Sequence, residues 1–378
     1  MKKGFKKLFF TIILFTIILI IFEVLTRIVI NFSPFLLNLN PPIMIEDDLL
    51  EHFHIPGIQT ISQSPHGEYK VKVKINRNGL RDKKIPIRKG NTEKRILILG
   101  DSFPEGIHVE LMETYTKVLE QELKSKGYNN FTVINAGVAG YSTIHEYLLL
   151  KNKGLDYNPD IVILSFFMND VSENHRFMDI FEINKNGEPV KVIQTTSKTK
   201  IIPKPIKYFL KRYSRLMVVF SKLYYLIRGS KQEELNPSRI GDLDFDRFAI
   251  LRKKYSNNYS EDWEFTSSLI LKTQKLCSLK EIEFILLIIP AGVQLNNSEW
   301  ENVNKFEHLS HESVNNYPQE YLKDFCKRND IRCLDLLPGL QKHKDGSLYF
   351  PYNGHFNCKG HKAASILILN YLENQGLL

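Results

Sequence analysis

The sequence predicts an α/β fold built on a parallel sheet. From residue 95 onward, short apolar segments typical of buried strands alternate with segments of helical periodicity. Strands are expected at 96–99, 131–135, 161–166, 284–289 and 331–336, and helices at 114–126, 144–150, 262–279, 319–328 and 361–373. Strands that alternate with helices imply right-handed crossovers, which place helices on both faces of the sheet and give three layers.

The N-terminus has the pattern of a membrane anchor. Four lysines in the first seven residues precede a charge-free run at 8–22, which 24–30 extend to the length needed to cross roughly 30 Å of hydrocarbon. Glu23 and Arg27 lie four residues apart on that helix and are expected to pair. No small-x-small cleavage site follows, so we expect an uncleaved, single-pass anchor. The lysines predict a cytoplasmic N-terminus with the rest of the chain outside.

We expect three regions. Residues 1–30 form the cytoplasmic tip and transmembrane helix, 31–90 a stalk with accessory strands, and 91–378 the α/β domain with an insertion at about 171–260. Prolines interrupt 31–90, an alternating pattern at 69–75 predicts a half-buried strand, and Asn78-Gly79 predicts a tight turn.

The net charge of +9 is concentrated in one stretch. Residues 191–231 contain eleven Lys or Arg and no acidic residue, interleaved with apolar side chains. This pattern is typical of a helix near an acidic membrane surface, and equally of a solvated helix with its apolar face on the domain. Because the charge is confined to one segment, a nucleic-acid-binding function is ranked last.

The four cysteines are an even set, as expected in an oxidising compartment. Cys326 and Cys333 have a spacing that allows a bridge between a helix and the next strand, but four ordinary thiols are equally compatible with the sequence. No pair has the spacing of a zinc site, so no metal is assigned.

Polar motifs follow the predicted strands at the edge of the sheet where ligands bind. Gly100-Asp101-Ser102 ends the first strand, "NAGVAGYST" at 135–143 follows the second, and Asn169-Asp170 follows the third. His355 precedes the last helix in "YNGHFNCKGH". Each motif alone is weak, since Gly-Asp-Ser is also a common helix cap. Together they predict an exposed hydroxyl, backbone and amide donors, and a general base at one edge.

These four motifs, in this order, resemble the SGNH hydrolases, or GDSL-type esterases, from residue 95 to the C-terminus. The lead-in "INRNGLRD" is also similar to that of membrane-anchored members. The resemblance implies a flavodoxin-like three-layer sheet and acyl transfer from an ester without cofactor or metal. Ser102 would be the nucleophile and His355 the base. The amides of Ser102 and Gly140 with the side chain of Asn169 would form the oxyanion hole.

Two positions depart from the family pattern. Phe167 stands where the third motif usually begins with glycine, and narrows the space beside Asn169. Asn353 stands where an aspartate usually precedes the histidine, so we expect a Ser-His dyad with or without help from Asn353. His361 is expected to be a structural or capping residue, and His108 and His145 surface or wall residues.

The sequence therefore predicts an extracytoplasmic esterase acting on an ester-bearing small molecule, or on an O-acyl group of an envelope glycan or lipid. Two alternatives stay open. An O-acyltransferase uses the same Ser and His if the site excludes water. A catalytically weakened binding protein would keep the pocket, and Asn353 is the residue that favours this alternative.

Overall fold

The computed structural model describes residues 2–32, 42–193, 249–251, 260–296, 315–343 and 346–378, together with residues 210, 214–217, 219–220 and 301. The chain divides into two compact units. One comprises Met1–Ile45 and Thr196–Asn236, and the other comprises Glu46–Thr195 and Pro237–Leu378. The larger unit contains the four predicted motifs around residues 102, 140, 169 and 355.

A five-stranded parallel sheet forms the centre of the larger unit. Its strands run in the order β11-β10-β7-β5-β6, and every neighbouring pair is parallel. Numbered along the domain, this order is the flavodoxin-like 2-1-3-4-5, which confirms the predicted fold class. The strands are β5 (Lys94–Gly100), β6 (Phe131–Gly137), β7 (Ile161–Phe167), β10 (Glu283–Ile289) and β11 (Arg332–Asp335).

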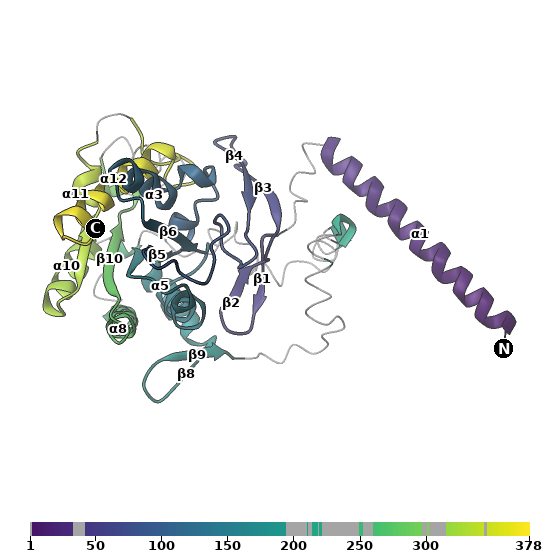
Figure 1. Ribbon diagram of the computed structural model, residues 1–378, viewed down its shortest axis with the longest axis horizontal. Coiled ribbons are helices and arrows are strands. Elements are labelled where there is room, and N and C mark those ends of the chain that lie inside the picture. Colours follow the sequence, from purple (N-terminus) through teal and green to yellow (C-terminus); the bar gives the residue numbers. More distant parts are fainter. Residues whose placement is uncertain are drawn as a thin grey trace. The chain divides into compact units, whose positions relative to one another are not determined.

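Helices cover both faces of this sheet (Figure 1). On one face lie α3 (Tyr115–Ser125) and α12 (Cys358–Asn374), which contact each other and share one core with β5. The opposite face carries α4 (Thr143–Leu149), α8 (Ser260–Ser278) and α10 (Tyr317–Arg328). Trp263 of α8 stacks on Phe166 of β7. Side chains along a strand alternate between the two faces of the sheet, and Ile163 and Phe167 of β7 face α3 and α12, so Phe166 faces the opposite side.

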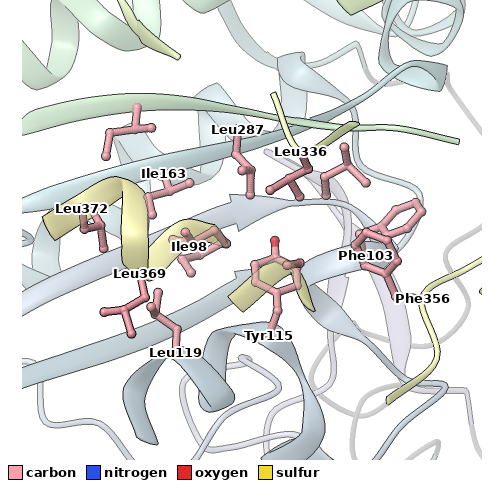
Figure 2. Close-up of a cluster of buried hydrophobic side chains, with 14 of the residues drawn as sticks. Ile98, Phe103, Tyr115, Leu119, Ile163, Leu287, Leu336, Phe356, Leu369 and Leu372 are labelled. Carbon is pink, nitrogen blue, oxygen red and sulfur yellow. The ribbon is translucent and has the colours of Figure 1, made fainter. Parts of the chain in front are cut away.

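The core between the sheet and α3 and α12 is apolar and closely packed, as Figure 2 shows. Ile98, Leu119 and Leu369 meet there at 0–2 % exposure. The Tyr115 hydroxyl is buried in this core and lies 2.7 Å from Ser165 Oγ, so its polar atom is satisfied. Phe103 and Phe356 pack together at one end of the cluster (Figure 2), and the Phe103 ring also contacts His355.

The segment before the domain contains more structure than the sequence indicated. Strand β4 (Lys70–Lys74) is the predicted alternating strand, with Val71 and Val73 buried, and it pairs with β3 (Gln59–Gln63). The hairpin of β1 (Met44–Asp47) and β2 (Glu51–His54) was not predicted. Strands β1 and β2 have four residues each, too few to give a clear periodicity.

The predicted insertion also begins with ordered elements. Helix α5 (Asn169–Met178) is followed by a hairpin of β8 (Phe181–Ile183) and β9 (Pro189–Val192), where we expected little strand structure. Most of the basic stretch at 191–231 lies outside the described residues.

Residues of the lead-in "INRNGLRD" bind the segment before β5 to the α/β domain through hydrogen bonds and an ion pair. Arg81 is buried and donates hydrogen bonds to the carbonyls of Glu105 (2.6 Å), Gly106 (2.8 Å) and Val109 (2.6 Å). Burial lowers the pKa of Arg81 to about 10, so it remains charged at neutral pH. Its neighbour Asp82 pairs with the buried Lys117 at 2.7 Å.

Helix α1 (Lys2–Phe32) is a single apolar helix. Its segment Gly4–Val29 has a mean hydropathy of 2.9 over its most apolar window, none of it buried, and is long enough to cross a membrane; a signal sequence has the same properties. The expected pair forms, with Arg27 Nε 2.8 Å from Glu23 Oε1. Glu23 also accepts hydrogen bonds from the Ser214 hydroxyl and from the Arg215 and Leu216 amides of the same compact unit.

Cys326 and Cys333 are free thiols, and so are Cys277 and Cys358. The Cys333 thiol hydrogen-bonds to Cys326 across the junction of α10 and β11, and this contact raises the pKa of Cys333. The structure therefore brings the two together, as their spacing allowed, without a bridge between them.

The core makes a direct prediction about stability. Leu119→Ala removes a fully buried side chain and leaves a cavity, so the free energy of unfolding should fall by about 2–5 kcal/mol. Leu279→Ala is the matched control, because Leu279 is 72 % exposed, and should change stability by less than about 0.5 kcal/mol. Urea denaturation of both variants measures the difference. Equal losses would contradict the packing described above.

Candidate active site

Ser102 occupies the first position of a short helix directly after the central strand. Asp101 caps that helix, α2 (Ser102–Glu105), by accepting a hydrogen bond from the Phe103 amide at 2.9 Å. The preceding Gly100 has φ +151°, and a Cβ there would lie 2.6 Å from Pro104 Cγ and 2.9 Å from Ser165 Cβ. Glycine is therefore required for the chain to turn from β5 into α2, and the turn places Ser102 at the edge of the sheet.

His355 reaches Ser102 from the other end of the domain. Its Nε2 lies 2.7 Å from Ser102 Oγ, although 253 residues separate the two along the chain. A tight turn holds the histidine: the Phe350 amide donates to the His355 carbonyl at 2.8 Å, and the Gly354 amide donates to the Phe350 carbonyl at 2.8 Å. Asn357 then caps α12 by accepting from two amides of its first turn.

Asn353 orients the imidazole. The Nδ1 of His355 lies 2.7 Å from Asn353 Oδ1 and 3.1 Å from the Asn353 carbonyl oxygen, and both oxygens are acceptors. Nδ1 therefore carries the proton, which leaves the lone pair of Nε2 facing the Ser102 hydroxyl. The structure thus brings Ser102, His355 and Asn353 into one hydrogen-bonded chain, the order of groups that makes a serine hydroxyl nucleophilic.

Gly140 and Asn169 lie on either side of Ser102. Gly140 follows β6 and Asn169 follows β7, and β5 lies between those two strands. Gly140 has φ +79°, which favours glycine. The two loops are joined by a hydrogen bond from the Thr143 hydroxyl to Asp170 at 3.1 Å. Asn169 hydrogen-bonds to the Glu173 carboxyl, and its Oδ1 has no partner among the described residues.

Aromatic rings form the wall around His355. Phe103 lies 5.1 Å from the His355 ring and 4.7 Å from Phe167, measured between ring centroids, so Phe167 packs beside α2. His108 lies 4.3 Å from His355. Burial, aided by the charge of His355, holds the pKa of His108 well below its usual value, so His108 is a neutral wall residue.

His361 has a structural place. Its Nδ1 accepts a hydrogen bond from the Tyr115 amide at the start of α3, at 3.2 Å. Burial lowers the pKa of His361 to about 3, so the ring stays neutral as an acceptor.

Buried carboxyl groups lie behind the site. Burial raises the pKa of Asp101 to about 7, and it raises the pKa values of Glu146 and Asp170 well above their usual range, with further increases from the charges of neighbouring carboxylates. All three residues are at most 2 % exposed. Burial and the neighbouring negative charges therefore favour the neutral form of Glu146 and Asp170.

One group of metal-ligating side chains occurs in the described part of the chain. Glu51, His52 and His145 have ligand atoms within 4.8 Å of one another. However, both ring nitrogens of His52 already hold hydrogen bonds, Nδ1 to Glu51 and Nε2 to the Ala139 carbonyl. We therefore assign these residues no metal.

Sequence reasoning missed the residues that support the loop around Gly140. Glu105 is fully buried and accepts hydrogen bonds from the Ala139 amide and from His54 Nε2, both at 2.8 Å. The Nε2 of His52 contacts the Ala139 carbonyl. His52 and His54 belong to β2 and Glu105 to α2, all far from Ala139 in the sequence, so no local motif marks them.

The raised pKa of Asp101 predicts a pH-dependent stability. A carboxyl whose pKa rises from 3.8 to about 7 on folding contributes stability that is complete below pH 4 and lost as the pH rises through 7. Asp101→Asn keeps the cap and removes the titration. The free energy of unfolding of this variant, relative to that of the wild type, should therefore rise by a few kcal/mol as the pH increases from 4.5 to 8, because each pKa unit is worth about 1.4 kcal/mol. Thermal unfolding at several pH values measures this gain, and a constant difference would contradict the prediction.

Comparisons with known proteins identify the family of the chain. Residues 96–368 match the family model of the GDSL-like Lipase/Acylhydrolase. Among solved structures, a GDSL-like lipase from Bacteroides thetaiotaomicron is 15 % identical over 77 % of this chain and 93 % of its own, with a TM-score of 0.37. An acetyl xylan esterase is 15 % identical over 73 % and 98 %, with a TM-score of 0.41. No curated protein matches. Because the family model covers more than half of the sequence, the chain belongs to the GDSL-like lipase/acylhydrolase family, whose members act on ester bonds.

Proposed function

We propose that this protein is an extracytoplasmic serine esterase that hydrolyses a carboxylic O-acyl ester. The observation that carries the proposal is the 2.7 Å contact between Ser102 Oγ and His355 Nε2, with the Nδ1 proton of His355 held by Asn353. This arrangement leaves the imidazole nitrogen nearest the hydroxyl free to accept its proton.

In this proposal, Ser102 Oγ attacks the ester carbonyl while His355 Nε2 takes the hydroxyl proton. The carbonyl oxygen becomes an oxyanion, which accepts hydrogen bonds from the amides of Ser102 and Gly140 and from the Asn169 side chain. The proton then passes from His355 to the leaving alcohol, and an acyl-serine remains. Water, deprotonated by His355, attacks the acyl carbon and releases the acid, which restores Ser102.

Asn353 limits the rate that this mechanism can reach. An amide oxygen fixes the tautomer of His355, but it has no negative charge to stabilise the imidazolium that forms during attack. A carboxylate at the same distance would add this attraction in a partly buried site, where it is stronger than in water. We infer an enzyme with the correct geometry and a moderate rate.

We place the reaction outside the cytoplasmic membrane. The supporting features are the lysines before α1 and the apolar length of that helix, which together favour an anchor with the N-terminus inside. In this organisation residues 1–30 are the anchor, 31–90 the accessory segment and 91–378 the catalytic domain. A tethered domain of this kind has access to O-acyl groups on envelope glycans or lipids, which we propose as substrates.

The proposal predicts that labelling and turnover depend on Ser102. Full-length protein in detergent should react with a fluorophosphonate probe and hydrolyse p-nitrophenyl acetate. Ser102→Ala should abolish labelling and reduce kcat by about 1000-fold or more. Ser221→Ala is a control on a serine outside these motifs and should keep both signals. Absence of labelling in the wild type would instead favour a binding protein.

A second prediction concerns the charge beside His355. Asn353→Asp places a carboxylate where Oδ1 now lies 2.7 Å from Nδ1, so kcat should rise by about tenfold or more. Asn353→Ala should lower kcat only modestly, because the backbone carbonyl at 3.1 Å still accepts the Nδ1 proton. Ester hydrolysis by the three forms at one pH gives the comparison. No gain in Asn353→Asp would mean that charge at this position does not limit the rate.

A further inference from the structure

The backbone of Ala139 is held on both sides by residues outside its own loop. Its carbonyl oxygen lies 3.0 Å from His52 Nε2, and its amide donates to Glu105 Oε2 at 2.8 Å. The Tyr141 hydroxyl, two residues further on, donates to the His52 carbonyl at 2.8 Å. Strand β2 therefore fastens the segment that leads into Gly140.

The Ala139 carbonyl and the Gly140 amide belong to one peptide group. A trans peptide is planar, so its C=O and N–H point in opposite directions, and the described chain contains no cis bond. A donor that fixes the Ala139 oxygen therefore also fixes the direction of the Gly140 N–H. The same hydrogen bond polarises the peptide and makes its N–H a stronger donor.

His52 is suited to this task because it donates from both ring nitrogens. Nε2 faces the Ala139 carbonyl and Nδ1 faces the Glu51 carboxylate, and neither oxygen has a proton to give. The ring also lies near His145 and Tyr141, at 5.8 and 5.0 Å between centroids. Burial lowers the pKa of His52, but the hydrogen bond and charge of Glu51, together with the Ala139 carbonyl and the charge of Glu105, raise it overall.

We propose that His52 is a positioning residue of the oxyanion hole: by donating to the Ala139 carbonyl, it aligns and polarises the peptide whose amide, that of Gly140, binds the oxyanion. This inference rests on the proposed function, in which Gly140 has that role. His52 touches no reacting atom, so its effect is transmitted through one peptide plane.

The test compares an ester with its thionoester, because sulfur accepts hydrogen bonds weakly. Full-length wild type, His52→Leu and His52→Gln are assayed in detergent with p-nitrophenyl acetate and p-nitrophenyl thionoacetate. His52→Leu should lower kcat on the oxygen ester by about tenfold, part of the 100- to 1000-fold effect typical of one oxyanion donor, with KM nearly unchanged. The same substitution should lower kcat on the thionoester less, so the ratio of kcat on the oxygen ester to kcat on the thionoester should be smaller than in the wild type. His52→Gln, which keeps a donor, should restore much of both.

The controls separate this role from general damage. His175→Leu removes another histidine–carboxylate pair, 2.6 Å from Asp262, on a side chain that is 66 % exposed, and should leave both rates unchanged. Unchanged kcat in His52→Leu, or an equal loss on both substrates, would overturn the role of His52 alone. Wild-type turnover that does not depend on Ser102 would overturn the proposed function, and this inference with it.

Discussion

The position of β5 between β6 and β7 is the constraint on which the site depends. Parallel strands present their carboxyl ends at one edge, so the loops after these three strands must lie next to one another. Ser102 ends the central strand, and Gly140 and Asn169 follow its neighbours. The hydrogen bond between Ser102 and His355 then requires only that the turn before α12 return to the same edge.

Close packing leaves no room for a side chain at Gly100 of the first motif or at Gly137 of the second. Gly137 lies so near α2 that a Cβ there would be 2.3 Å from the Glu105 amide nitrogen, and Gly100 meets Pro104 in the same way. These glycines allow α2 to lie directly against the loop after β6. The two motifs therefore meet a steric requirement, the absence of a Cβ at these glycines, as well as supplying polar groups to the candidate site.

Residues before β5 hydrogen-bond to the loops of the candidate site. Arg81 binds three carbonyls just after α2, while His54 and Glu105 form a fully buried pair that ends on the Ala139 amide. Buried ionic groups cost desolvation energy unless each is fully paired, and here their partners are the loops of the site. Stability of the accessory segment and geometry of the site are thus coupled through the same hydrogen bonds.

The sequence by itself determined the parallel sheet and the position of each sheet strand to within a few residues, and its resemblance to a known family predicted that Ser102 and His355 would meet. The contact of Asn353 Oδ1 with His355 was left open and came from the tertiary structure. Buried parallel strands and amphipathic helices have a local periodicity, and strand ends meet whatever the intervening loops do. Only the tertiary structure decided the hairpins at 44–54 and 181–192 and the contacts of His52 and Glu105 with Ala139. Those strands are too short for a periodic signal, and a hydrogen bond across 87 residues has no local signature.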